Sequence, residues 1–146
     1  MEGFPGLERA RKSADELVEE ARSIIGPRLS PHDAHEGMEL GQVVLIDIRP
    51  YEQQMGGGMI PGAIVIDSNV FEFRCDPAQP DKYRDPAVTA VDYDQCLVVI
   101  CNQGYQSSLN AAGLRRMGLY RATDVAGGME AWIAAGLPVI PYPEQP

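Results

Sequence analysis

Residues 98–109 read VVICNQGYQSSL: an apolar strand, a lone cysteine at Cys101, a turn that contains Gly104, and the first turn of a predicted helix. At the start of a helix, several backbone N–H groups lack partners and the aligned peptide dipoles leave partial positive charge. An anion is stabilised there, so this position raises the thiolate fraction of a cysteine at neutral pH. Gly104 permits backbone angles that other residues resist, and Ser107 and Ser108 are predicted N-caps of the helix. The stretch predicts a reactive cysteine at the carboxyl end of a strand.

Cys101 taken alone has a second interpretation, because free cysteines are often no more than small buried apolar groups. Further blocks of sequence favour the reactive cysteine. They are LIDIR at 45–49, GMIPGA at 58–63, and GGMEAW at 127–132 with GLPV at 136–139. Taken in order with residues 101–108, these blocks resemble the rhodanese (sulfurtransferase) domain family across residues 30 to 140.

The resemblance implies an α/β, rhodanese-like three-layer fold with a central, mostly parallel sheet flanked by helices. It also implies that Cys101 takes a sulfane sulfur from a donor, carries it as a persulfide, and passes it to a thiol or cyanide-like acceptor. The donor is a small sulfur compound such as thiosulfate, or a protein persulfide. Backbone amides of the loop would hold the sulfur anion, as in other preorganised anion sites. The loop residues are Asn102, Gln103, Gly104, Tyr105, Gln106 and Ser107, and Asp47 and Arg49 are expected to support the loop.

The loop departs from the family's pattern at Gln106, where many members have an arginine. We expect weak affinity for the thiosulfate dianion as a result. Met59 also replaces the histidine that is usual in the 58–63 block, a change that we interpret as structural.

Two other functions compete with sulfur transfer. Cysteine phosphatases and arsenate reductases need an arginine six positions after the cysteine, whose planar fork grips phosphoryl oxygens. Here that position is Ser107, and residues 101–112 contain no arginine, which disfavours a phosphatase. A non-catalytic rhodanese-like binding or regulatory module is the remaining alternative.

Composition fits one domain, because 146 residues with 45% hydrophobic content can bury a core. The formal charge of −9 argues against nucleic acid or an anionic membrane as partner. We expect no membrane span, since no run of about 18 apolar residues occurs. The basic residues Arg74, Lys82 and Arg84 could form a local patch for an anionic donor, but scattered charges on a solvated surface loop are the favoured interpretation of each.

Three cysteines without a secretory leader point to thiols in a reducing compartment, so a cytoplasmic location is expected. No cofactor is implied, and His32 and His35 are interpreted as part of a polar helix face and not as metal ligands. Cys96 is expected to be structural. Cys75, in a long loop, has the chemistry to resolve a persulfide on Cys101, but a loop cysteine without a role is the favoured interpretation. Trp132 is expected to anchor the last helix.

Hydrophobic periodicity predicts alternating helices and strands. Helices are expected at 7–25, ended by Gly26 and Pro27, and from Ser30 and Pro31 to 40–41. Strands are expected at 43–48, 63–66, 97–100 and 122–125, helices at 107–117 and 128–135, and a surface excursion with one short helix at 68–95.

The predicted organisation has three parts: an amphipathic helical extension at 1–28, the rhodanese domain at 29–142, and a tail at 143–146. The apolar stripe of the first helix must be covered. It packs either on its own domain or against a second copy in a homodimer.

Overall fold

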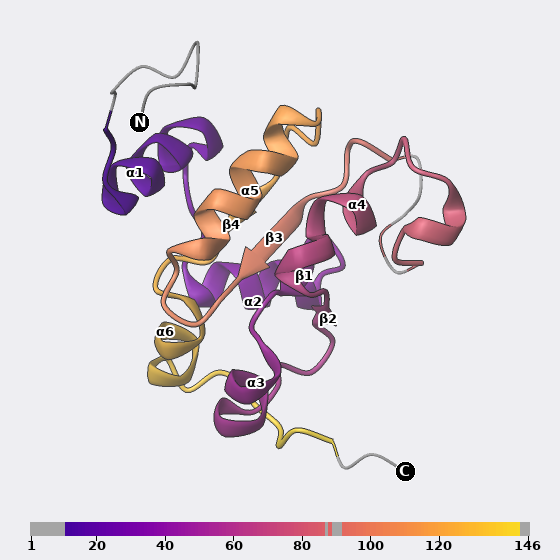
Figure 1. Cartoon of the computed structure of the whole chain (residues 1–146). Helices are drawn as coiled ribbons and strands as arrows, with labels where there is room; N and C mark the ends of the chain where they lie inside the picture. Colours follow the sequence, from indigo (N-terminus) through magenta and orange to yellow (C-terminus); the bar gives the residue numbers. More distant parts are fainter. Residues whose placement is uncertain (1–10, 87, 89–91, 144–146) are drawn as a thin grey trace.

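The computed structural model describes residues 11–86, 88 and 92–143. A parallel sheet lies at its centre (Figure 1). The strands are β1 (Val44–Asp47), β2 (Ile64–Val65), β3 (Leu97–Ile100) and β4 (Thr123–Asp124), in the order β2-β1-β3-β4 with every neighbouring pair parallel. β1 and β3 are apolar and rich in β-branched residues, as expected of strands covered on both faces. The predicted α/β class is confirmed.

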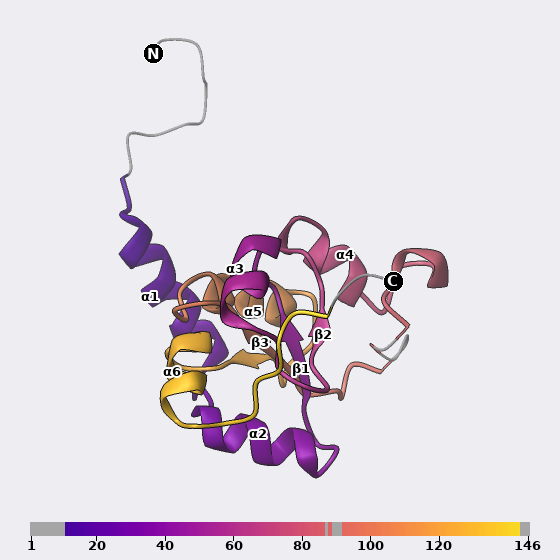
Figure 2. The same ribbon diagram turned by 90° about the horizontal axis from the view of Figure 1, so that it is seen from below.

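Helices cover both faces of the sheet. Alternate strand residues point to opposite faces, so Ile46 and Val99 join one core cluster while Leu45 and Val98 join the other. In Figure 2, α4 and α5 lie above the strands and α2 lies below them. The helices are α1 (Ala14–Ile25), α2 (Pro31–Glu39), α3 (Tyr51–Gly57), α4 (Phe71–Cys75), α5 (Gln106–Arg116) and α6 (Gly128–Ala134).

The helix predicted over 7–25 begins later than expected. The Ser13 hydroxyl accepts from the N–H of Glu16, and the Glu16 carboxylate accepts from the N–H of Ser13, so a capping box starts α1 at Ala14. Residues 11–13 are not helical, and residues 7–10 lie outside the described residues.

The apolar side of α1 packs within its own chain. Val18, Ala21 and Ile25 are buried, and α1 lies alongside α5 (Figure 1). Packing on its own domain, one of the two alternatives expected, therefore covers these three residues, whereas Ala14, Leu17 and Ile24 of the same helix are exposed. The homodimer stays a prediction, which the mass of the full chain in solution checks.

Other element predictions hold with small shifts. Ser30 caps α2 by accepting from the N–H of Asp33, with proline in the first turn. α5 begins one residue before the predicted start, and β3 matches its prediction. Segment 68–95 holds α4 and, among its described residues, two short 3₁₀ turns (Ser68–Val70 and Asp81–Tyr83).

Trp132 anchors α6, as expected. Its ring is fully buried, and its Nε1–H donates to the carbonyl of Pro138 at 3.0 Å. In the described part of the chain, no helix combines the length and the hydropathy that crossing a bilayer requires.

Candidate active site

Cys101 directly follows β3, at the carboxyl end of a central parallel strand, where open α/β sheets bind their ligands. Its Sγ accepts hydrogen bonds from the N–H of Gly104 at 3.2 Å and of Ser107 at 3.3 Å. The side chain is 7% exposed. The sulfur thus lies in a small cradle of amides at the first turn of α5, a setting that favours an anion.

The loop carbonyls face away from the sulfur, toward the first turn of α6. The carbonyl of Cys101 accepts from the N–H of Met129 at 2.8 Å, and that of Asn102 accepts from Glu130 at 3.0 Å. Gly128 makes this approach possible, because a Cβ there would lie 2.5 Å from the Cys101 carbonyl oxygen. The start of α6 therefore takes up the loop's acceptors, while loop donors point to the sulfur.

Gly104 closes the loop at a position that no other residue fits. Its φ is +88°, and a Cβ would lie 2.9 Å from the backbone nitrogen of Gly127. This positive φ and the close contact turn its N–H toward Cys101. The sequence-based prediction of a glycine turn at this point is confirmed.

The predicted N-cap role of Ser107 and Ser108 is wrong. Tyr105 occupies the N-cap position, without a side-chain cap. Both serine hydroxyls lie in the first turn and donate to Oδ2 of Asp124 at 2.7 Å. Asp124, fully buried at β4, also accepts from Nε of Arg28 at 2.7 Å. A buried carboxylate thus fixes the start of α5 behind the cysteine.

Cys101 opens onto a pocket of about 400 Å³. Gln106 lines it, and its Nε2–H donates to the Oδ1 of Asn110 at 2.8 Å. The charged residue among those lining the pocket is Arg49. The lining residues are Ile48, Arg49, Pro50, Gln53, Ser68, Cys101, Asn102, Gln103, Tyr105 and Gln106.

The Arg49 guanidinium makes its hydrogen bonds to groups of the protein itself. Its Nε donates to Oδ1 of Asp47 at 3.0 Å and to Oδ2 at 3.2 Å, and its Nη2 donates to Oδ2 at 2.8 Å. It also donates to the carbonyls of Gly58 at 2.7 Å and Gln53 at 3.2 Å. Both side chains of the ion pair are buried, at 0% and 1% exposure. The pair ties the end of β1 to α3, and it leaves the pocket with little positive charge to offer.

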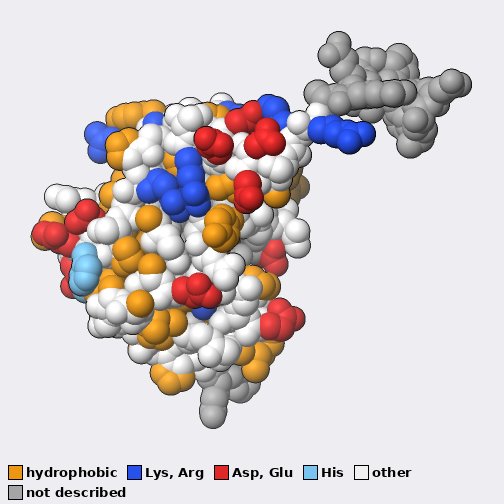
Figure 3. Space-filling model, turned by 90° about the vertical axis from the view of Figure 1, so that its left-hand side faces the viewer, with side chains coloured by type: hydrophobic (Ala, Val, Ile, Leu, Met, Phe, Trp, Pro, Cys, Tyr) orange, Lys and Arg blue, Asp and Glu red, His pale blue; other side chains and the backbone are white. Residues whose placement is uncertain are grey.

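The alternative of a basic patch beside Cys101 finds no support in the pocket. Arg74, Lys82 and Arg84 are absent from the residues that line the pocket. Arg84 is buried and pairs with Asp81, and Arg74 donates to the carbonyl of Tyr83. On the face drawn in Figure 3, Lys and Arg side chains are interspersed with Asp and Glu, so that face carries no broad field of one sign.

Cys75 is not positioned to resolve a persulfide. It lies at the end of α4 with no exposed surface. Burial, with the nearby carboxylates of Asp85 and Glu72, raises the pKa of its thiol to about 12. A thiol that stays protonated is a poor nucleophile.

Cys96 and the histidines show no sign of site chemistry. Burial raises the pKa of the Cys96 thiol, whose Sγ lies 3.6 Å from the carbonyl oxygen of Arg121. His35 packs edge-on against Trp132 with ring centroids 5.6 Å apart. Among the described residues, no three His, Cys, Asp or Glu side chains gather as a metal site would need.

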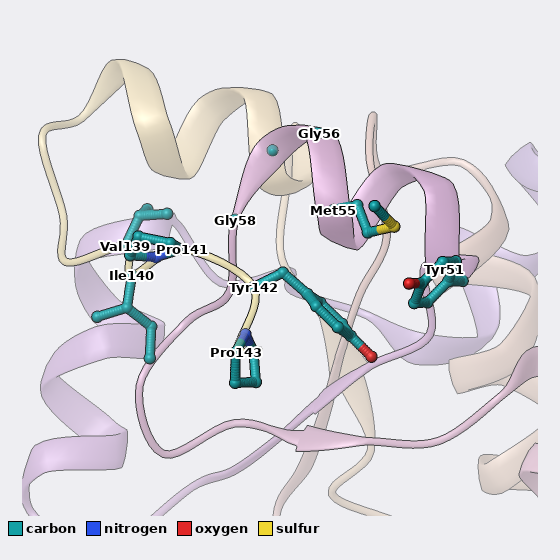
Figure 4. Close-up of a pocket in the computed structure, with 10 residues that line it drawn as sticks. Tyr51, Met55, Gly56, Gly58, Val139, Ile140, Pro141, Tyr142 and Pro143 are labelled. Carbon is teal, nitrogen blue, oxygen red and sulfur yellow. The ribbon is translucent and has the colours of Figure 1, made fainter. Parts of the chain in front are cut away.

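A second pocket, of about 690 Å³, lies between α3 and the C-terminal segment (Figure 4). Tyr51 and Tyr142 meet edge-on there with ring centroids 5.2 Å apart, and Met55 and Val139 add apolar surface. Its lining includes no residue of the Cys101 loop. It is therefore separate from the pocket of the cysteine.

Comparison with known proteins defines the class to which this fold and cysteine loop belong. Residues 30–135 match the family described as the Rhodanese-like domain, so the chain belongs to that family. A sulfurtransferase of Allochromatium vinosum is 28% identical over 98 residues, which cover 67% of this chain and 78% of that protein. The thiosulfate sulfurtransferase GlpE of Glaesserella parasuis is 28% identical over 111 residues, 76% of this chain and 90% of that protein.

A solved structure from Rhodopseudomonas palustris shares more of the chain. It is described as a protein of unknown function and possible tyrosine phosphatase. It is 31% identical with a TM-score of 0.77, and the match covers 94% of this chain and 100% of that one. The similarity thus extends beyond the matched domain.

Arg22, Arg28 and Asp124 contact the cysteine loop or the start of α5, and sequence reasoning missed them. Arg22 on α1 and Arg28 after it both donate to the carbonyl of Gly104, each at 2.9 Å. These contacts join residues that are 82 and 76 positions apart in the chain, so no local sequence motif could have predicted them.

Proposed function

We propose that this protein is a sulfurtransferase that carries a sulfane sulfur as a persulfide on Cys101. The observation that supports it most directly is the pair of N–H groups, from Gly104 and Ser107, aimed at the sulfur at the mouth of a pocket. The same donors suit a thiolate and the terminal sulfur anion of a persulfide. The two relatives named as sulfurtransferases add support at the level of the family.

The proposed reaction has two displacements. The Cys101 thiolate attacks the sulfane sulfur of the donor, an S–S bond forms, and the donor's bond to that sulfur breaks. With thiosulfate the leaving group is sulfite, and with a thiol persulfide it is the thiolate. An acceptor thiolate then attacks the terminal sulfur, leaves as a new persulfide, and restores the Cys101 thiolate. One difficult transfer is thereby divided into two easier steps.

Persulfides are the donor class that the pocket suits best. Its polar lining consists mainly of amide, hydroxyl and backbone groups, and the Arg49 guanidinium is engaged by Asp47 and two carbonyls. A dianion such as thiosulfate gains from a free cation in such a pocket, whereas a persulfide carries at most one charge. We infer that a small or protein-bound persulfide is the better donor.

Phosphatase activity has weaker support here, even though one structural relative bears that description. The position that a phosphatase gives to arginine is Ser107, whose hydroxyl is buried and bonded to Asp124. Because the Arg49 guanidinium is engaged by Asp47 and two carbonyls, the oxygens of a phosphoryl group lack their usual bidentate partner in this pocket.

Intact mass spectrometry tests the proposal. The reduced protein is incubated with thiosulfate and, separately, with a thiol persulfide, alongside Cys101→Ser. A gain of one sulfur atom that requires Cys101 supports the sulfurtransferase, and the faster donor identifies the substrate class. If neither donor adds sulfur to the folded protein, the binding or regulatory module replaces this proposal.

A further inference from the structure

α1 lies outside the residues that match the family, yet it reaches the cysteine loop. The family match begins at residue 30, whereas Arg22 projects from the last turn of α1. Its Nη2–H donates to the carbonyl of Gly104 at 2.9 Å, and its Nε–H donates to Oγ of Ser108 at 3.2 Å. Its guanidinium also lies over the ring of Tyr105, 5.7 Å from the centroid. Arg22 therefore contacts three residues of the loop and of the turn that follows it.

Gly104 is held from two sides. Its N–H donates to Sγ of Cys101, while its carbonyl accepts from both Arg22 and Arg28. The carbonyl of Gly104 and the N–H of Tyr105 belong to one peptide group. Cations at the carbonyl polarise that group and orient the loop. The N–H groups that donate to Sγ are those of Gly104 and Ser107, so the two arginines act on the surroundings of the sulfur by fixing the orientation of the loop, from outside the residues that line the pocket.

The two arginines differ in whether a nearby carboxylate compensates their charge. Arg28 pairs with the buried carboxylate of Asp124, with contacts at 2.7 and 3.0 Å, so its charge is compensated. Among the described residues no carboxylate pairs with Arg22, which is half-buried. The loop itself has the neutral Gln106 where a cation is common. Arg22 is thus the cation near the loop that lacks a compensating carboxylate in the described chain.

We propose that α1 is a working part of the sulfur-transfer site, with Arg22 as a positioning residue that orients the loop and stabilises the anion on Cys101. The proposal rests on the proposed function and deepens it, because it assigns to α1 the positive charge that the loop lacks. Arg22 does not line the pocket, so it acts through the loop and not on the donor.

The test compares Arg22→Gln and Arg22→Lys with Arg115→Gln in the full chain. Arg115 is a matched control because it also bonds α1 to the domain, donating to the carbonyls of Ile25 at 2.7 Å and Ala122 at 2.6 Å, without touching the loop. The single-turnover rate of persulfide formation is measured by rapid-quench mass spectrometry over a range of thiol persulfide concentrations. Thermal unfolding of each variant is recorded beside it.

For Arg22→Gln we expect the rate at saturating donor to fall about tenfold, because the substitution removes the charge and the shorter amide cannot replace both hydrogen bonds of the guanidinium. The half-saturating donor concentration should stay unchanged, because Arg22 lies outside the pocket. Arg22→Lys should recover much of the rate by restoring the charge. Arg115→Gln should transfer sulfur at the wild-type rate even if its melting temperature falls.

Three results would overturn the proposal: equal rates in wild type and Arg22→Gln, an equal fall in Arg115→Gln, or a rise in half-saturating donor concentration as the main effect. The rate of Cys101 alkylation by iodoacetamide at neutral pH, followed by peptide mass, separates the two proposals. If wild type takes up no sulfur, the proposed function fails. A slower alkylation in Arg22→Gln than in Arg115→Gln would still support the role of α1.

Discussion

Ser107 connects the sulfur of Cys101 to the neighbouring edge strand β4, because its Oγ–H donates to Oδ2 of Asp124 at 2.7 Å, 17 residues away, while its N–H donates to Cys101. Asp124 also accepts from Ser108 and from Arg28. One buried carboxylate on the edge strand thus holds the start of α5 and the segment after α1 by hydrogen bonds.

Asp124→Asn is predicted to destabilise the fold. The amide cannot accept from all these donors, and Arg28 loses its counter-charge, so the free energy of unfolding should fall by about 3–5 kcal/mol, as for other broken buried pairs. Urea denaturation followed by circular dichroism measures it. Asp94→Asn, which removes an exposed carboxylate bonded to Tyr120, is the control and should change stability little. Equal losses in both variants would contradict the role given to the buried network.

Arg49→Ala is predicted to lower the stability of the fold, since Arg49 has no direct part in the reaction. The substitution leaves Asp47 as an unpaired buried carboxylate and also removes bonds to two carbonyls, so the loss should again be about 3–5 kcal/mol. In the double variant Asp47→Ala with Arg49→Ala, the loss should be smaller than the sum of the two single losses. Denaturant titration of the four proteins measures the coupling. A variant of full stability that no longer transfers sulfur would instead give Arg49 a direct part in the reaction.

Gln106→Arg is predicted to improve the use of thiosulfate. Gln106 lines the pocket of Cys101, and a cation there attracts the dianion, so KM for thiosulfate should fall several-fold with little change for a thiol persulfide. Steady-state kinetics with both donors measures this. Gln42→Arg adds the same charge at an exposed residue outside that pocket and serves as the control. No change in Gln106→Arg would mean that the charge of the pocket is set by other groups.

The buried thiol of Cys75 is predicted to make the free energy of unfolding depend on pH. Its folded pKa is raised by burial from the ordinary 9.0 to about 12, so between these values the unfolded chain loses a proton that the folded chain keeps. The stabilising contribution is complete below pH 9 and is lost as the pH rises toward 12, with a slope of up to about 1.4 kcal/mol per pH unit. Denaturation at a series of alkaline pH values, compared between wild type and Cys75→Ala, isolates it. Parallel curves for the two proteins would count against a buried, protonated thiol.

The central elements were predictable because their signals are local. β3 is a continuous apolar run that ends at a cysteine, and the Asp-x-Arg turn after β1 is a short motif. Ser30 followed by proline marks the start of α2 correctly. Each of these depends on neighbouring residues, and tertiary contacts do not override them.

The serines of α5 show why the rest could not be predicted. A hydroxyl at a helix start usually caps it, so Ser107 and Ser108 matched the cap pattern. The buried Asp124 competes for both hydroxyls, and it lies on another strand. The same reason hid Arg22: its partner, the Gly104 carbonyl, is a backbone atom with no sequence signature. The helix start at Ser13 was predictable from Ser-x-x-Glu, and the longer apolar periodicity obscured it.

The attachment of Arg22 to the Gly104 carbonyl makes the docking of α1 and the charge state of the sulfur thermodynamically linked. Linkage is reciprocal, so whatever α1 contributes to holding an anion on Cys101, that anion returns as an equal gain in the stability of α1 against local opening. Amides of α1 should therefore exchange with deuterium more slowly when Cys101 carries an anion than when its sulfur is capped as a neutral thioether by iodoacetamide. Exchange at the first helix of the described chain would then report on the charge carried by the sulfur of Cys101.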